Sequence, residues 1–176
     1  MPLTLTRFTA SKAALLAAAV LALSACGDAG KVDAPSVPEV QVDAAVTLDD
    51  VLAHPRRDAE RARDQFRNPK ETLEFFEIAP GQRVAEIWPG WYTNVTAPYL
   101  AANDGTYVAV LYPEGSGERL QGRLDAYKLK YADADVYGDI EYGGLLKDSG
   151  PILPAESVDT ILSFRNVHNW MGGGYA

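Results

Sequence analysis

Residues 83–92 have the sequence Arg-Val-Ala-Glu-Ile-Trp-Pro-Gly-Trp-Tyr, and this stretch decides the fold. Its first half, residues 83–87, has the pattern of a short buried strand, and the Trp-Pro-Gly that follows interrupts the strand. From Trp91 to Ala102, apolar side chains recur at the spacing of an α-helix. The order of strand, loop and helix predicts one unit of an α/β fold.

A second unit of the same kind follows a turn at residues 103–105. Residues 106–111 favour a strand, and the next segment has one apolar face at helical spacing. That face consists of Leu120, Leu124, Tyr127 and Tyr131. Two more strands are expected around residues 135–140 and over residues 160–164. Strands that alternate with helices predict an α/β fold with parallel strands and flanking helices.

Shorter helices are expected before this sheet. Thr47 is suited to cap a helix, because its hydroxyl can accept a hydrogen bond from a free N–H of the first turn. The charged residues 58–67 predict an amphipathic helix, and residues 70–76 a second short helix after a proline. Pro98 is expected to kink the helix in which it lies, or to restart that helix near Thr96.

The amino-terminal residues 1–25 have the pattern of a secretion signal. Arg7 and Lys12 precede an apolar run of 11 residues, which is too short to cross a bilayer because a spanning helix needs about 20. The run ends in Leu-Ser-Ala-Cys at residues 23–26, which resembles the lipobox of bacterial lipoproteins. This resemblance implies lipidation of Cys26 and an exported, membrane-anchored protein that faces the periplasm or cell envelope. The alternative is an amphipathic first helix with a buried cysteine.

Residues 26–46 predict a flexible tether, because they contain no aromatic side chain and too few large apolar groups to bury a core. The folded domain is then expected over residues 47–176. Two functional classes are disfavoured by composition. A formal net charge of -8 repels phosphate backbones, so we expect no nucleic acid partner. A single cysteine and two histidines exclude an internal disulfide and a multi-cysteine zinc site, and we expect no metal.

Three strings are distinctive, over residues 84–93, 97–100 and 164–171. They include Trp-Pro-Gly-Trp-Tyr and Arg-Asn-Val-His-Asn-Trp, which are improbable as generic core patterns. With the segment between residues 63 and 76, they resemble an exported branch of predicted class I, Rossmann-like methyltransferases that depend on S-adenosylmethionine. The likeness extends over residues 58–171.

The resemblance implies a seven-stranded sheet that binds S-adenosylmethionine at the tips of its first strands. Because the chain stops soon after its predicted fourth strand, we expect the sheet to be truncated after strand 4. The residues expected to bind the cofactor follow the strand ends, where ligands of parallel sheets lie. They are Glu86, Pro89, Gly90, Trp91, Tyr92, Tyr112, Glu114 and Asp139.

The residues of the first loop have a possible role in cofactor binding and an alternative, purely structural interpretation. A carboxylate at Glu86 can accept a hydrogen bond from the cofactor's ammonium group, and Gly90 lets the backbone approach the ligand. The alternative is an ordinary turn in which Glu86 pairs with Arg83 and the neighbouring aromatic residues belong to the core. The usual loop of the class carries two or three glycines, whereas this one has Gly90 alone.

The second strand ends differently from the usual pattern, in which an acid follows the strand and binds the ribose. Here Tyr112 could stack on adenine, or Glu114 could reach the ribose from two residues later. Asp139 could accept from the adenine amine, and its alternative is a solvated acid in a turn.

The catalytic candidates follow the fourth predicted strand. His168 could take a proton from a nucleophilic acceptor, and Asn166 and Asn169 could orient that acceptor, with Trp170 as a wall. The alternative is that His168 and Asn169 cap the next segment while Trp170 packs in the core.

These observations predict a methyltransferase tethered to the cell envelope, which transfers a methyl group to a small-molecule or protein acceptor. The alternative is a catalytically inactive, methyltransferase-like lipoprotein that binds a ligand or a protein. The missing glycine and the missing acid after the second strand favour the binding module, and the His168 string favours the enzyme.

Overall fold

The computed structural model describes residues 44–174. The predicted secretion signal, the lipidation site at Cys26 and residues 26–43 of the predicted tether lie outside the described residues. Within residues 44–174, no helix is long and apolar enough to span a membrane.

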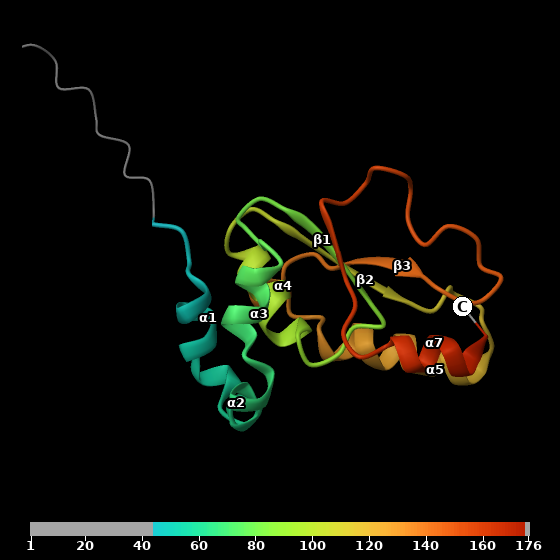
Figure 1. The fold of residues 1–176 in the computed structure, drawn as a ribbon, viewed down its shortest axis with the longest axis horizontal. Helices are drawn as coiled ribbons and strands as arrows, with labels where there is room; N and C mark the ends of the chain where they lie inside the picture. Colours follow the sequence, from blue (N-terminus) through green and yellow to red (C-terminus); the bar gives the residue numbers. More distant parts are fainter. Residues whose placement is uncertain (1–43, 175–176) are drawn as a thin grey trace, which may run out of the picture. The chain divides into compact units, whose positions relative to one another are not determined.

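The described chain is an α/β fold with a parallel sheet flanked by helices, an arrangement compatible with a Rossmann-like fold (Figure 1). The sheet has four strands in the order β3-β2-β1-β4. The strands are β1 (Arg83–Ile87), β2 (Thr106–Leu111), β3 (Glu141–Gly144) and β4 (Thr160–Leu162). Both neighbours of β1 run parallel to it, and the chain passes from β1 to β2 on one side but returns to β4 on the other.

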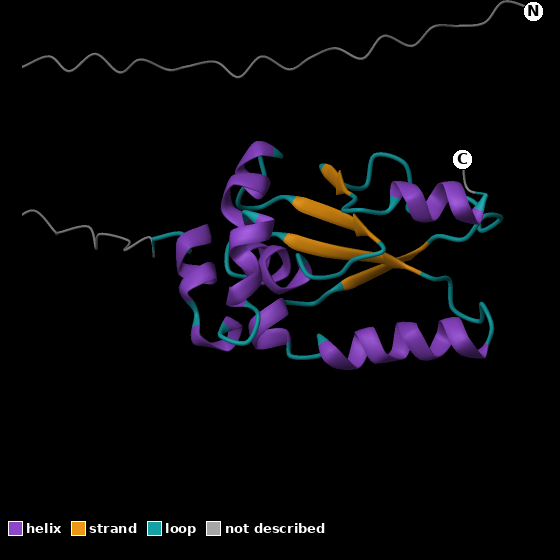
Figure 2. Cartoon of the chain, turned by 60° about the horizontal axis from the view of Figure 1, so that its bottom comes forward, coloured by secondary structure: helices purple, strands orange, loops and turns teal. Residues whose placement is uncertain are grey.

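The helices divide between the two faces of the sheet (Figure 2). The long helix α5 and the carboxyl-terminal helix α7 lie on opposite sides of the strands. The α-helices are α1 (Leu48–Ala53), α2 (Asp64–Arg67), α3 (Pro69–Phe75), α4 (Thr93–Ala101), α5 (Glu118–Lys130), α6 (Ala134–Tyr137) and α7 (Val167–Gly173). Two short 3-10 helices, η1 (Pro55–Arg57) and η2 (Arg61–Arg63), join α1 to α2.

Both faces of the sheet are buried, as parallel sheets require. Alternate residues of a strand point to opposite faces. One face therefore contributes Val84 and Tyr107 to the main core, together with side chains of α1, α3, α4 and α5. The other face contributes Ala85 and Val108 to a smaller cluster, which the segment from residue 145 to residue 158 covers. Glu86 shares the face of Val84 and thus lies on the side of the main core.

The predictions for β1 and β2 are confirmed residue for residue, and β4 is confirmed although it ends at Leu162. The predicted third strand over residues 135–140 is wrong. Asp133 caps helix α6 by accepting a hydrogen bond from the Asp135 N–H at 3.2 Å, so the first part of this segment is helical, up to Tyr137, and the rest is not a strand. The strand β3 instead contains two adjacent glycines. A Cβ at Gly144 would stand 2.9 Å from Pro113, so close packing of backbone explains a glycine there.

The segment before the sheet, residues 47–75, agrees with the prediction at its first helix, α1, and at its last, α3. Thr47 caps α1 through a capping box with Asp50, and α3 begins at a proline as expected. The single amphipathic helix predicted over residues 58–67 is wrong, because η2 and α2 replace it. The buried Arg57 pairs with Asp64 at 2.7 Å and also donates to the Leu52 carbonyl, which holds this segment in short turns.

Helix α4 continues through Pro98, so the restart predicted near Thr96 is wrong. A proline in a helix leaves the carbonyl four residues earlier without its N–H donor. That carbonyl belongs to Asn94, and the guanidinium of Arg56 donates to it at 3.1 Å. A side chain from η1 therefore replaces the hydrogen bond that Pro98 cannot make.

Replacing Arg56 by Met is expected to lower the free energy of unfolding by about 1.5–3 kcal/mol, the usual net value of a hydrogen bond to a charged group. In a Pro98→Ala background the loss is expected to be smaller, because the new N–H can donate to the Asn94 carbonyl. Urea unfolding of the wild type, both single variants and the double variant measures this coupling. An equal loss in the two backgrounds would contradict the replacement of one donor by the other.

Candidate functional site

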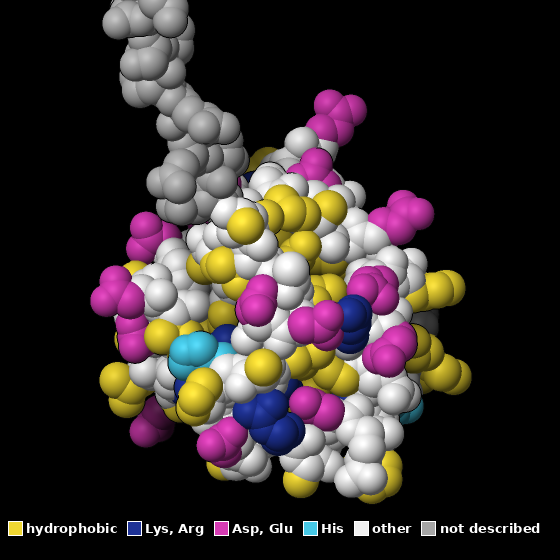
Figure 3. All heavy atoms as spheres, turned by 90° about the vertical axis from the view of Figure 1, so that its left-hand side faces the viewer, with side chains coloured by type: hydrophobic (Ala, Val, Ile, Leu, Met, Phe, Trp, Pro, Cys, Tyr) yellow, Lys and Arg dark blue, Asp and Glu magenta, His cyan; other side chains and the backbone are white. Residues whose placement is uncertain are grey.

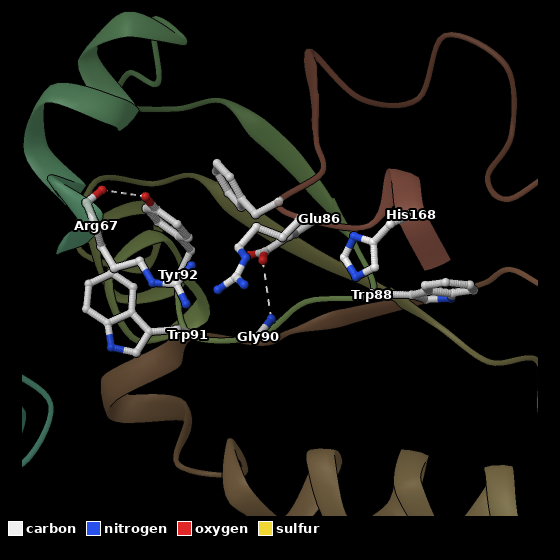
Figure 4. A pocket seen from close by; sticks show the side chains of 9 residues that line it. Arg67, Glu86, Trp88, Gly90, Trp91, Tyr92 and His168 are labelled. Atoms are coloured by element: carbon white, nitrogen blue, oxygen red, sulfur yellow. Dashed lines mark hydrogen bonds between the residues drawn. The ribbon is translucent and has the colours of Figure 1, made fainter. Parts of the chain in front are cut away.

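A pocket of about 260 Å³ opens at the carboxyl end of β1 (Figure 4). Four segments that are distant in the sequence meet there: the end of α2, the loop between β1 and α4, the loop after β4, and the start of α7. The lining residues are Arg67, Glu86, Trp88, Gly90, Trp91, Tyr92, Phe164, Arg165 and His168. The pocket lies between the ends of β1 and β4, where the strand order reverses. Ligands of open parallel sheets bind at such reversal points.

Glu86 is the last buried residue of β1 and is only 2% exposed. One carboxyl oxygen accepts a hydrogen bond from the Gly90 N–H at 3.2 Å, and the other accepts from the Tyr107 hydroxyl at 2.6 Å. Burial raises the pKa of this carboxyl from 4.5 to about 7, although both hydrogen bonds lower it. The predicted alternative, in which Glu86 pairs with Arg83, is wrong, because Arg83 pairs with Glu141.

A chain of hydroxyl groups, buried at Tyr107 and Thr93 and partly buried at Tyr127, leads away from Glu86. The Tyr107 hydroxyl lies 3.1 Å from Thr93 Oγ1, which lies 2.9 Å from the Tyr127 hydroxyl. Burial raises the pKa of Tyr107 and of Tyr127, so both phenols remain protonated near neutral pH. The chain links β1, β2, α4 and α5 through hydrogen-bonded side chains.

The loop after β1 has a backbone conformation that glycine adopts most readily. Trp88 has a φ of 47° and donates its backbone N–H to the Val110 carbonyl at 2.8 Å. Its ring contacts the rings of Tyr112 and Trp170, with centroids 6.3 and 6.4 Å away. At Gly90, apart from Gly90 itself and its two chain neighbours, no heavy atom of the described residues lies within 4 Å of the place where a Cβ would stand, so the backbone there is open to a ligand.

His168 is exposed at the start of α7 and lines the same pocket as Glu86. Figure 4 shows His168 on the side of the pocket where Trp88 lies, and Arg67 on the other side, with Glu86 between them. Asn166 is buried and donates to the Ile87 carbonyl at 2.8 Å, which ties the loop after β4 to β1. Asn169 is exposed and lies outside the pocket lining.

The structure does not bring the other cofactor candidates to this pocket. Tyr112 and Glu114 line a separate pocket of about 300 Å³, where Glu114 accepts a hydrogen bond from Lys128 at 2.7 Å. Asp139 is exposed in the turn after α6 and lines neither pocket. Pro89 is half-buried between Trp88 and Gly90 in the β1 loop.

Sequence reasoning missed four lining residues: Arg67, Trp88, Phe164 and Arg165. It also missed Tyr107, which carries a hydroxyl into the buried part of β2, where all other residues are apolar. Such a buried hydroxyl needs a partner, so Tyr107 and Glu86 on neighbouring strands were a readable signal. Among residues 44–174, no group of three or more His, Cys, Asp and Glu side chains is placed to hold a metal ion.

No family model matches the chain, and neither a curated protein nor a solved structure matches it.

The Glu86→Gln variant is expected to remove one part of the pH dependence of stability. Between pH 4.5 and about 7 the carboxyl ionises in the unfolded chain but keeps its proton in the folded one. Stability therefore falls by about 3 kcal/mol as pH rises through this window and stops falling above it. Glutamine has no proton to lose, so the variant lacks this fall.

Urea unfolding of both proteins at a series of pH values measures the effect as the difference between their free energies of unfolding. Taking the difference cancels the contribution of other titrating groups. A difference that stays constant from pH 4 to pH 8 would show that Glu86 ionises at its ordinary pKa.

Proposed function

We propose that residues 47–176 form a class I, Rossmann-like methyltransferase domain that uses S-adenosylmethionine. The observation that carries this proposal is the pocket at the end of β1, where the buried Glu86 carboxyl and the His168 imidazole line one cavity. The position of the cavity, at the reversal of strand order in a parallel sheet, also favours a ligand site. The left-handed backbone at Trp88 supports the likeness to a glycine loop, because glycine is the usual residue in that conformation.

The residues of the pocket fit one end of the cofactor. Glu86 has a carboxyl group beside the open backbone of Gly90, which suits the amino acid end of S-adenosylmethionine. The adenosine end has no matching group in the same cavity, since Tyr112 and Glu114 line another pocket. When bound, S-adenosylmethionine supplies an electrophilic methyl group.

The side chains of this chain then have two tasks. The exposed imidazole of His168 can accept the proton that a nucleophilic acceptor must lose. The aromatic rings of Trp91, Tyr92 and Phe164 shield the pocket on one side, where Tyr92 and Phe164 stack with centroids 3.9 Å apart. The acceptor is a small molecule or a protein that presents its nucleophile beside His168.

We also propose that the domain is exported and anchored to the membrane by a lipid on Cys26. The support is the order of the basic residues, the short apolar run and Leu-Ser-Ala-Cys at residues 23–26. The methyl acceptor is then a component of the cell envelope.

A second candidate is a ligand-binding lipoprotein that has kept the fold and lost the reaction. The arrangement of the two pockets favours it: Trp88 lines one pocket, while its ring contacts Tyr112, which lines the other. The Trp88 indole ring therefore lies in the path of an adenosine moiety that would extend from Glu86 toward Tyr112, which disfavours binding of the whole cofactor.

Calorimetric titration of the full chain with S-adenosylhomocysteine distinguishes the two candidates. The wild type is expected to bind, and Gly90→Leu is expected to weaken binding at least about 10-fold, because the new side chain enters the space where the ligand approaches. Gly122→Leu is the matched control, since Gly122 in α5 is equally open but lies away from the pocket. An absence of heat with the wild type at millimolar ligand would contradict methyl transfer and support the binding module.

The anchor is tested by replacing Cys26 with Ala, which is expected to release the protein from the membrane fraction because the thiol that carries the lipid is gone. Ser24→Ala keeps a small residue before the cut and is expected to leave the protein in that fraction. Fractionation and immunoblotting measure both variants. Retention of Cys26→Ala on membranes would contradict lipidation at this position.

A further inference from the structure

The pocket at the end of β1 has a charge opposite to that of the whole protein. The chain has 24 acidic and 16 basic residues, and acidic side chains are spread over the face shown in Figure 3. The pocket is lined instead by two arginines, Arg67 and Arg165, and by His168. Its one acid is Glu86, whose pKa of about 7 leaves it largely protonated below neutral pH. A basic lining of this kind attracts an anion.

Within the described residues, neither guanidinium group has a structural partner. Within residues 44–174, the guanidinium groups of Arg67 and Arg165 make no hydrogen bond and no ion pair. Four other arginines of the described chain serve structure: Arg56 and Arg61 bind backbone carbonyls, while Arg57 and Arg83 bind carboxylates. The two arginines at the pocket therefore keep all their donors for a ligand.

The backbone holds both arginines at the pocket. The Tyr92 hydroxyl donates to the Arg67 carbonyl at 2.6 Å, as the dashed line in Figure 4 marks. Arg165 itself has a φ of 61°, a left-handed conformation that costs energy in a residue with a side chain. The next residue, Asn166, is fixed to β1 because its side chain donates to the Ile87 carbonyl. Both cations are thus presented from segments that are tied to β1 or its loop.

We infer that Arg67 and Arg165 bind a carboxylate group of the ligand that enters this pocket. Guanidinium groups match the geometry of a carboxylate and bind it through paired, charge-assisted hydrogen bonds. A doubly charged phosphate fits less well than a singly charged carboxylate, because Glu86 faces the same cavity and, once ionised, repels two negative charges more strongly than one. The inference rests on the proposed function, since the carboxylate belongs either to the amino acid end of S-adenosylmethionine or to the methyl acceptor.

The test compares ligands with and without the carboxylate. Benzoate and benzamide form the first pair, chosen because aromatic rings line the pocket. S-adenosylhomocysteine and 5′-methylthioadenosine form the second pair, since the latter lacks the amino acid end. Binding to the full chain is measured by tryptophan fluorescence and by calorimetry. The variants are Arg67→Gln and Arg165→Gln, with Arg63→Gln as the matched control because Arg63 is exposed on η2 and outside the pocket.

The two substitutions are expected to weaken binding of a carboxylate ligand about 10- to 100-fold each, while Arg63→Gln leaves it unchanged. A loss for benzoate alone assigns the carboxylate to the acceptor. A loss for S-adenosylhomocysteine without a loss for 5′-methylthioadenosine assigns it to the cofactor.

The inference is overturned if neither benzoate nor S-adenosylhomocysteine loses affinity in Arg67→Gln and Arg165→Gln relative to Arg63→Gln, a result that includes an absence of wild-type binding to both. It is also overturned if benzamide and 5′-methylthioadenosine lose as much as the acids. Failure of the proposed function has a different signature: neither adenosine compound binds the wild type, whereas benzoate still binds and depends on the two arginines.

Discussion

The buried carboxyl of Glu86 is the constraint on which the rest of this structure depends. It lies at the end of the central strand β1, where two hydrogen bonds fix it, one from the loop at Gly90 and one from Tyr107 on β2. An ionised carboxylate is costly in such a place, so the group holds its proton up to about pH 7. The hydroxyl chain through Thr93 and Tyr127 extends this network into α4 and α5. The strand, the loop and the two helices are therefore positioned by one buried polar network.

The pocket is a consequence of that network and of two further ties to the same segment. Asn166 binds the Ile87 carbonyl and brings the loop after β4, and with it His168, to the end of β1. Tyr92 binds the Arg67 carbonyl and brings the end of α2 to the opposite side. The cavity thus forms where a neutral acid and an imidazole meet two guanidinium groups that pair with no side chain of residues 44–174. These groups suit an anionic or zwitterionic ligand. Both the proposed methyltransferase and the carboxylate inference require such a ligand.

Sequence patterns sufficed for those parts of the fold in which local periodicity and packing agree. The strands β1 and β2 were predicted with their bounds, and Glu86 and His168 were both singled out and line one pocket. Some of the failures occurred where a contact with a distant segment overrides a local rule. Pro98 does not restart its helix, because Arg56 from another segment supplies the missing donor. The glycines of β3 resemble a turn, but they are needed where the strand meets Pro113 and Ile152. The roles of Arg67 and Arg165 were invisible for the same reason, since only the folded chain brings them together.

Carbon-13 NMR of the Glu86 side-chain carboxyl, followed together with the Gly90 amide during a pH titration, tests the central claim most directly. The account predicts that the carboxyl resonance titrates with a midpoint near pH 7. The Gly90 amide resonance should shift with the same midpoint, because its N–H donates to the titrating oxygen. A carboxyl midpoint near the ordinary value of 4.5, with a Gly90 amide that does not respond, would contradict the buried network and the pocket built on it.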